Sequence, residues 1–361
     1  MSLTGEGNIR SSNLELLRIV SMLLIILHHA SVHGGFTLAE QVLSVNKLFL
    51  QLIAFGGKLG VCCFILITGY FMINSTFKIK KLLKLIFEVL FYSVGIMLIF
   101  YGFGLAEFNL VTLVKSLLPI THTLYWFVTA YVILYILSPF INILLKNCSR
   151  KMHALFILVL FAAGSLIPSL TLGNMYVNNL GLFICFYAIA AYIRMYPDAC
   201  ASWFKKTKEN LLAFAGIFLL FAVSVLTFDL IGNYIDIVAR NATHFSALSS
   251  PLIILGGVCL FLVFKNLRIP NSKFINQVAL SMFGVYLIHD NPFVRTWLWH
   301  DVFRNAMWFE SPYLVLIILG LGIVVFCGCV VIDQVRIRVV EKPLFAWIDR
   351  VEERMRGKEG C

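Results

Sequence analysis

The residues best suited to chemistry lie in one apolar segment near the N-terminus, residues 13–33. This segment carries Arg18 and, eleven positions later, His29. In a helix these two side chains would lie about 20° apart around the axis and about 16 Å apart along it. An arginine binds anionic groups, and a neutral imidazole accepts a proton from a hydroxyl. The spacing therefore indicates His29 as a general base and Arg18 as a binding group for an anionic part of a substrate.

The adjacent histidine, His28, would point about 80° away from Arg18, so we assign it a packing or hydrogen-bonding role. The face that carries Arg18 and His29 also holds Glu15, Met22 and His33. Ionisable side chains at membrane depth are costly and commonly mark a functional site. The alternative is an arginine that reaches lipid headgroups and a histidine that ends the helix near the interface.

A metal site is the other chemistry that this segment allows. His29 and His33 are four residues apart, which is a spacing used by two metal ligands on one helix. The sequence offers no evident third ligand, and none of the nine cysteines forms a CxxC pair. We therefore expect no metal, and we interpret the cysteines as small apolar residues.

A cluster of lysines follows the second apolar segment. Lys78, Lys81 and Lys84 recur every three residues in the stretch FKIKKLLKLIF. Lysines of this kind bind phosphate groups as point charges. The same cluster would also arise as the ordinary basic flank of a membrane helix.

Four further candidates lie at the ends of other apolar segments. Tyr125 and Trp126 lie at the outer boundary of one segment, as in an interfacial aromatic belt. His289 ends the stretch YLIH, at a depth that we expect to match His29. Glu341 follows the last segment, where a charged flank is the simpler explanation.

These residues must be positioned by membrane helices, because the chain is 60% hydrophobic and only 13% charged. Soluble domains are about 25% charged. The net charge of +11 suits contact with an anionic membrane leaflet, and we expect no nucleic-acid partner. An all-α bundle of about ten transmembrane helices is predicted, because segments of roughly 20 apolar residues span the bilayer. The segments are 14–33, 48–73, 82–101, 124–145, 152–171, 176–196, 210–231, 246–264, 277–297 and 312–333.

The basic residues predict the topology of this bundle. With a cytoplasmic N-terminus, most of the 29 lysines and arginines fall on the cytoplasmic side, as the positive-inside rule requires. The exceptions are Lys47, Lys58, Lys115, Arg240, Arg295 and Arg304. We expect both termini in the cytoplasm and one domain over residues 1–361, with a core of about 13–345 and a charged tail at 346–361.

Several of these stretches together resemble the integral-membrane acyltransferase family three, whose bacterial members O-acylate cell-surface polysaccharides. The first match is an arginine, ten residues and a histidine, seen here as Arg18 and His29. The others are FILITGYF, the YWF before the fourth segment, the YLIH of the ninth segment and the E-x-P at 341–343. The family's arginine pair after the second helix is replaced by lysines, which lack the bidentate fork of arginine.

This resemblance implies an acyl-CoA-dependent O-acetyltransferase in the bacterial cytoplasmic membrane. Acetyl-CoA would be the donor substrate, and a hydroxyl of a glycan or lipid-linked saccharide would be the acceptor. His29 would act as the base, and Arg18 with Lys78, Lys81 or Lys84 would bind the CoA phosphates. A cytoplasmic donor and a histidine in the outer half predict a polar path between the levels of Arg18 and His29.

A proton-coupled transporter of small molecules is the alternative function. Ten helices with buried ionisable residues would suit it, but the internal repeats typical of transporters are not visible in the sequence. The oligomeric state and the acceptor sugar are not predicted by the sequence.

Overall fold

A computed structural model describes residues 11–173, 175–198 and 205–359, and these residues form helices and no strands. Within them, eight helical segments are long and apolar enough to cross a membrane. They are Ser12–Val32 (α1), Val45–Met72 (α2), Ile79–Gly102 (α3), Trp126–Asn147 (α5), Arg150–Thr171 (α6 and α7), Thr207–Gly232 (α9), Asp236–Asn266 (α10 and α11) and Leu314–Glu353 (α15 and most of α16). The protein is therefore an all-α polytopic membrane bundle, as its composition predicted.

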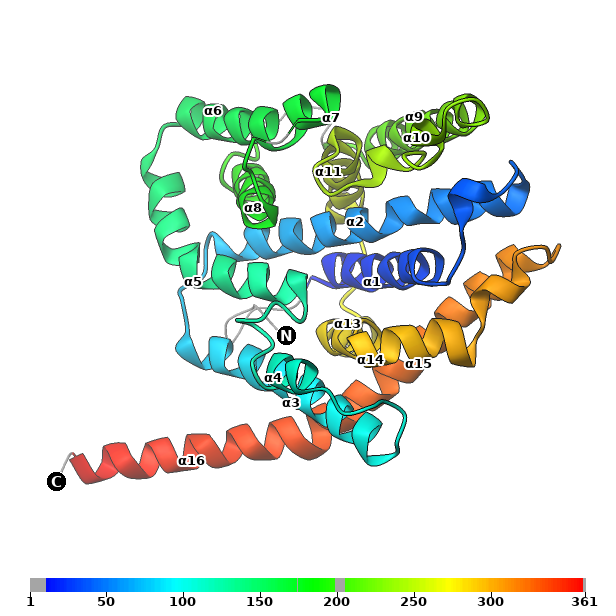
Figure 1. Ribbon diagram of the computed structural model, residues 1–361. Coiled ribbons are helices and arrows are strands. Elements are labelled where there is room, and N and C mark those ends of the chain that lie inside the picture. The colour runs from blue at the N-terminus through cyan, green and yellow to red at the C-terminus, as the bar shows by residue number, and fades with distance from the viewer. Residues whose placement is uncertain (1–10, 174, 199–204, 360–361) are drawn as a thin grey trace.

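The centre of the bundle is formed by α1 and α2, with α6 to α11 on one side and α3, α13 (Met282–His289) and α15 (Leu314–Arg336) on the other (Figure 1). Two glycines of α2 allow the close approach of α1. A Cβ on Gly60 would lie 2.6 Å from the backbone oxygen of Ser21, and a Cβ on Gly57 would overlap the His28 ring. Small residues at such positions let membrane helices pack backbone to backbone.

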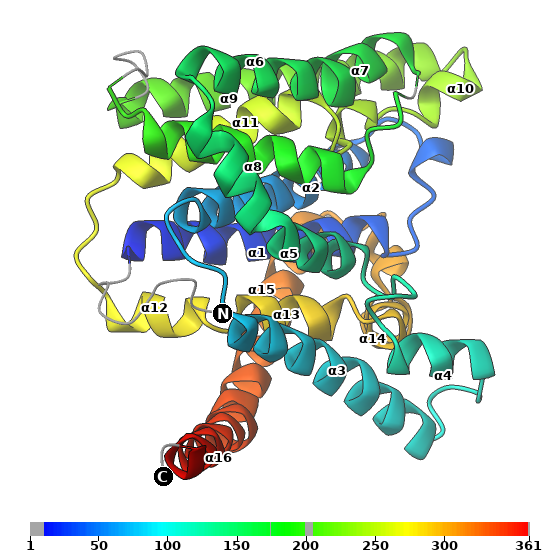
Figure 2. The same ribbon diagram turned by 90° about the vertical axis from the view of Figure 1, so that its left-hand side faces the viewer.

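The predicted ninth segment, 277–297, is not one helix. It is divided into α12 (Lys273–Ala279), α13 and α14 (Pro292–Thr296), and α12 and α13 lie beside α1 (Figure 2). At the break between α13 and α14, the side chain of Asn291 accepts a hydrogen bond from the Phe293 N–H. Pro292 has no N–H to donate, so the chain starts a new helix there. The prediction of one continuous helix is wrong, and the sixth segment is the shorter α8 (Asn179–Met195).

The C-terminal segment is helical through most of its length. After α15, a π-helical turn at Ile337–Glu341 leads into α16 (Lys342–Glu359), which extends away from the bundle (Figure 1). The predicted charged tail, 346–361, is therefore helical within the described residues. Its cytoplasmic location, like that of the N-terminus, stays a prediction.

Arg336, at the end of α15, is buried and paired with three carboxylate side chains. Its guanidinium lies 3.0 Å from Glu88, 2.8 Å from Asp333 and 2.7 Å from Glu341. Because a buried charge needs paired and hydrogen-bonded partners, this network fixes α15 against α3. It explains the position of Glu341, which the sequence offered as a candidate site residue.

Candidate active site

A pair of histidines joins two helices that are distant in the sequence. Nδ1 of His29, on α1, lies 3.0 Å from Nε2 of His289, at the end of α13. The expectation that these two residues lie at a similar depth is confirmed. His28 instead bonds through Nδ1 to the backbone oxygen of Ala54, at 2.8 Å, so its predicted hydrogen-bonding role is confirmed as well.

The hydrogen bonds of the neutral pair determine which nitrogens carry protons. Nδ1 of His289 lies 2.6 Å from the Val285 carbonyl oxygen, which can only accept, so this nitrogen is the donor. Nε2 of His289 is then an acceptor, and Nδ1–H of His29 donates a hydrogen bond to it. Nε2 of His29 is left without a proton, which is the state that a general base requires.

An acidic side chain lies close enough to stabilise a positive charge on His29. Oδ1 of Asp290 is 3.6 Å from Nδ1 of His29. This distance is too long for a hydrogen bond, but it allows a strong Coulombic attraction to a protonated His29. The same oxygen is 3.2 Å from Nη1 of Arg295. Asp290 is buried, so its field is weakly screened at the histidine.

The third ligand that a metal site would need is present in space. Ligand atoms of His29, His33 and Asp290 lie within 4.8 Å of one another. The sequence did not reveal Asp290 in this role, because the grouping depends on the packing of α1 against the break after α13. Arg295 competes for the carboxylate oxygen of Asp290, which weakens these three residues as a cation site.

Tyr125 holds the end of α13 in place. Its hydroxyl donates to the Leu287 backbone oxygen at 3.0 Å and accepts from Nδ2 of Asn291 at 2.7 Å. It is buried at the start of α5 and contacts neither histidine by a hydrogen bond. Tyr125, a sequence candidate, is therefore a positioning residue for the helix that carries His289.

Replacing Tyr125 with phenylalanine should lower the free energy of unfolding by about 1–3 kcal/mol, because two buried polar groups lose their partner. Thermal unfolding of the purified protein in detergent would measure this loss. Tyr313→Phe is the matched control, since Tyr313 is 65% exposed. Equal stability of the two variants would contradict the positioning role.

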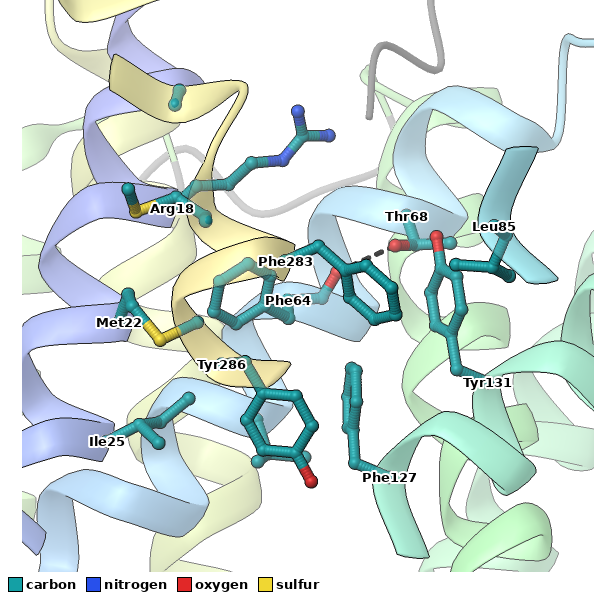
Figure 3. Close-up of a pocket in the computed structure, with 13 residues that line it drawn as sticks. Arg18, Met22, Ile25, Phe64, Thr68, Leu85, Phe127, Tyr131, Phe283 and Tyr286 are labelled. Atoms are coloured by element: carbon teal, nitrogen blue, oxygen red, sulfur yellow. Dashed lines mark hydrogen bonds between the residues drawn. The ribbon is translucent and has the colours of Figure 1, made fainter. Parts of the chain in front are cut away.

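A pocket, here called the Arg18 pocket, lies between α1, α2, α5 and α13 (Figure 3). On α1 it is lined by Arg18, Met22 and Ile25, and the next position of that helical stripe is His29. The predicted shared face of Arg18 and Met22 is thus confirmed. On the other wall, α13 contributes Tyr286, whose ring centroid lies 6.2 Å from that of His289.

The remaining walls of the Arg18 pocket are mostly apolar. They come from the side chains of Val61, Phe64, Thr68, Leu85, Phe127, Tyr131, Ala279, Met282 and Phe283. The sequence predicted a polar path between the levels of Arg18 and His29, and this prediction of polarity is wrong because the pocket is mostly apolar. The pocket offers a largely apolar channel that ends one helical turn before His29.

Arg18 is not a free cation. Its Nη1 lies 3.0 Å and 2.9 Å from the two carboxylate oxygens of Glu15, and both residues are buried. Glu15, the other candidate on this stripe, therefore offsets the charge of Arg18.

The three candidate lysines divide into two groups. Lys81 precedes the pocket residue Leu85 by four positions on α3, so the two share a helical face, and Lys78 is the extended residue that caps the start of this helix. Lys84 lies on another face, 3.5 Å from Glu341, with its ammonium over the Phe345 ring. Lys84 therefore belongs with the Arg336 network and not with the pocket.

Trp126 lies outside the Arg18 pocket. It lines a second cavity together with Lys58 of α2, whose Nζ is 4.5 Å from the centroid of the indole ring.

The sequence reasoning missed the roles of Lys58, Tyr286, Asn291 and Arg295. Lys58 had a visible signal, because it interrupts an apolar segment as Arg18 does. The run HDNP also signalled a helix break through its asparagine and proline.

Comparison with known proteins assigns the family. A family model described as an acyltransferase domain matches residues 11–333, which is nearly the whole chain. No curated protein and no solved structure matches the chain. The protein therefore belongs to acyltransferase family 3, and it is a multi-pass membrane acyltransferase.

Proposed function

We propose that the protein transfers an acetyl group from cytoplasmic acetyl-CoA to a hydroxyl of a cell-surface or lipid-linked glycan. The unprotonated Nε2 of His29, one turn beyond the end of the Arg18 pocket, is the observation that carries this proposal. The bacterial cytoplasmic membrane is the proposed location, with both termini in the cytoplasm.

The pocket suits the donor. Its apolar walls match the acyl group, and the pantetheine arm would extend from this group out of the pocket. Lys81, on the face of α3 that continues from the pocket wall, and Lys78, which caps this helix, would bind the CoA phosphates. The Arg18–Glu15 pair would orient the amide groups of the arm by hydrogen bonds.

The transfer step follows from the proton positions. Nε2 of His29 takes the proton of the acceptor hydroxyl, and the hydroxyl oxygen attacks the thioester carbonyl carbon. The imidazolium that forms is stabilised by Asp290 and by the bond to His289. The C–S bond then breaks, His29 returns the proton to the CoA sulfur, and the products are an O-acetyl ester and free CoA.

Incubating membranes that contain the protein with labelled acetyl-CoA and endogenous glycan tests this proposal. We expect labelled glycan and free CoA in equal amounts. Label that crosses the membrane without release of CoA would favour the transporter and overturn the transferase.

Arg18→Gln should raise the KM for acetyl-CoA by about tenfold, because it removes a charged donor and leaves the negative charge of Glu15 beside an anionic substrate. The double variant Glu15→Gln with Arg18→Gln should recover part of this loss. CoA release at increasing acetyl-CoA concentrations gives both values, and Lys208→Gln, at an exposed position, is the control for charge. An unchanged KM in Arg18→Gln would exclude Arg18 from donor binding.

A further inference from the structure

The second cavity, here called the Lys58 cavity, lies at the end of the bundle where α1 carries His29. Its walls come from α2, the N-terminal ends of α5 and α8, and the segment before α11 (Pro251–Asn266). Its volume is about 460 Å³. This is within the range of about 300–1,000 Å³ that is usual for small-molecule sites.

Lys58 is unusual among the cations embedded in this bundle. Arg18, Lys47 and Arg336 each lie within 3.0 Å of a carboxylate oxygen. Lys58 has no carboxylate within 4.0 Å in the described part of the chain, although it lies on the membrane-spanning helix α2. Its ammonium lies over the Trp126 ring instead. An ionisable side chain of this kind at membrane depth is expected to have a partner, and here a ligand can supply it.

The surroundings favour an anion. The cavity lies at the N-terminal ends of α5 and α8, where helix dipoles place partial positive charge. Asn179 and Ser249 supply polar groups, and the Trp126 ring supplies a flat apolar face. A sugar that carries a negative charge has the matching features, because it combines hydroxyl groups, an apolar ring face and an anionic oxygen.

The Lys58 cavity is also coupled to the active site. The charge of Lys58 acts on His29, His33 and Asp290, so the cavity and the histidine pair are electrostatic neighbours. Gly57, the residue before Lys58, packs on the His28 ring. The Lys58 cavity therefore lies near the part of α1 that carries His28 and His29.

We propose that the Lys58 cavity is the acceptor site and that it selects a glycan with an anionic group, which pairs with Lys58. This proposal rests on the proposed acyl transfer. The anion is either a carboxylate on the sugar or the phosphate that links a saccharide to its lipid carrier. In both cases the pairing orients the sugar so that one hydroxyl reaches Nε2 of His29.

Binding of three hexose probes separates these cases. Methyl glucoside is neutral, methyl glucuronide carries a carboxylate, and glucose 1-methyl phosphate carries a phosphodiester. Binding is measured by calorimetry on the His29→Ala protein in nanodiscs, so that turnover does not interfere. We expect at least one anionic probe to bind about tenfold more tightly than the neutral probe. Preference for the glucuronide identifies a sugar carboxylate, and preference for the phosphodiester identifies the lipid linkage.

Variants at Lys58 test whether its positive charge causes the preference for anionic probes. Lys58→Gln should abolish the preference and Lys58→Arg should retain it, whereas Lys115→Gln, at an exposed lysine of α4 (Leu110–Leu117), should leave it unchanged. Unchanged binding of acetyl-CoA shows that each variant is folded. Equal binding of the three probes, no binding of either anionic probe at millimolar concentration, or a preference that survives in Lys58→Gln would overturn the proposal.

Acyl transfer by the parent protein is measured separately with acetyl-CoA and the same probes. Anion-selective binding without transfer to any probe would support an anion site at Lys58 but overturn its role as the acceptor site. Transfer to neutral and anionic probes at equal rates would reject the anionic acceptor and support the transferase.

Discussion

Replacing His29 with alanine is expected to abolish acyl transfer, with a fall in rate of about 10²- to 10⁴-fold, which is the usual contribution of a general base. The reason is that Nε2 of His29 is the unprotonated nitrogen at the end of the histidine pair, beyond the Arg18 pocket. Acetylation of glycan in cells and release of CoA by the purified protein would both measure the loss. Binding of acetyl-CoA should persist, because His29 does not line the donor pocket.

The adjacent histidine is the matched control for this experiment. His28 bonds to the Ala54 backbone oxygen and packs on Gly57, so His28→Ala removes a hydrogen bond between α1 and α2 but no group of the proton chain. We expect this variant to lose stability and to keep much of its transfer activity. Activity of His29→Ala equal to that of the parent, at equal protein level, would reject the proposed mechanism.

The sequence predicted the features that depend on one helix. The period of an α-helix relates Arg18, Met22 and His29 without knowledge of any neighbour, and both Arg18 and Met22 line one pocket as expected. The same argument separated His29 from His28. The all-α membrane bundle could also be predicted from the sequence, because apolar segment length and loop charge are local properties.

Features that depend on packing between distant segments could not be predicted from the sequence. His289 and Glu341 both looked like candidates at segment ends, yet His289 meets His29 across 260 positions while Glu341 joins Arg336. A single sequence contains no signal for that difference. The lysines illustrate the same limit, since Lys84 faces Glu341 and Lys81 shares the face of Leu85.

The break after α13 connects these observations to the chemistry. Asp290 is the C-terminal cap of α13, and its N–H still donates to the Tyr286 carbonyl oxygen at 3.1 Å, as in a helix. In the structure the chain turns at this point, and Asp290 lies 3.6 Å from Nδ1 of His29. Asn291 supports the turn twice, as the cap of α14 and as a donor to Tyr125. The end of α13 therefore places the groups that assist the base, and the turn after Asp290 holds this helix end in position.

Replacing His289 with phenylalanine is expected to lower kcat by about 10²-fold or more, although His289 touches neither substrate. Its Nε2 accepts a hydrogen bond from Nδ1–H of His29, which keeps Nε2 of His29 unprotonated and fixes the orientation of the ring. Phenylalanine cannot accept a hydrogen bond, so His29 would populate the other tautomer and turn more freely. Loss of the correct tautomer in comparable catalytic triads costs about 10⁴-fold. Initial rates of CoA release over a range of acetyl-CoA concentrations would measure the effect.

A glutamine at position 289 provides the test of this positioning role. Its side-chain oxygen can accept from Nδ1 of His29, so His289→Gln should lose only about tenfold in kcat, since one hydrogen bond of lower quality replaces another. Both variants should keep the parent KM for acetyl-CoA, because His289 does not line the Arg18 pocket. Nitrogen NMR of labelled histidine should report Nδ1–H at His29 in the parent and a mixture in His289→Phe. Equal kcat in the Phe and Gln variants would show that His289 supports the fold alone, and the tautomer of His29 would then be controlled by Asp290.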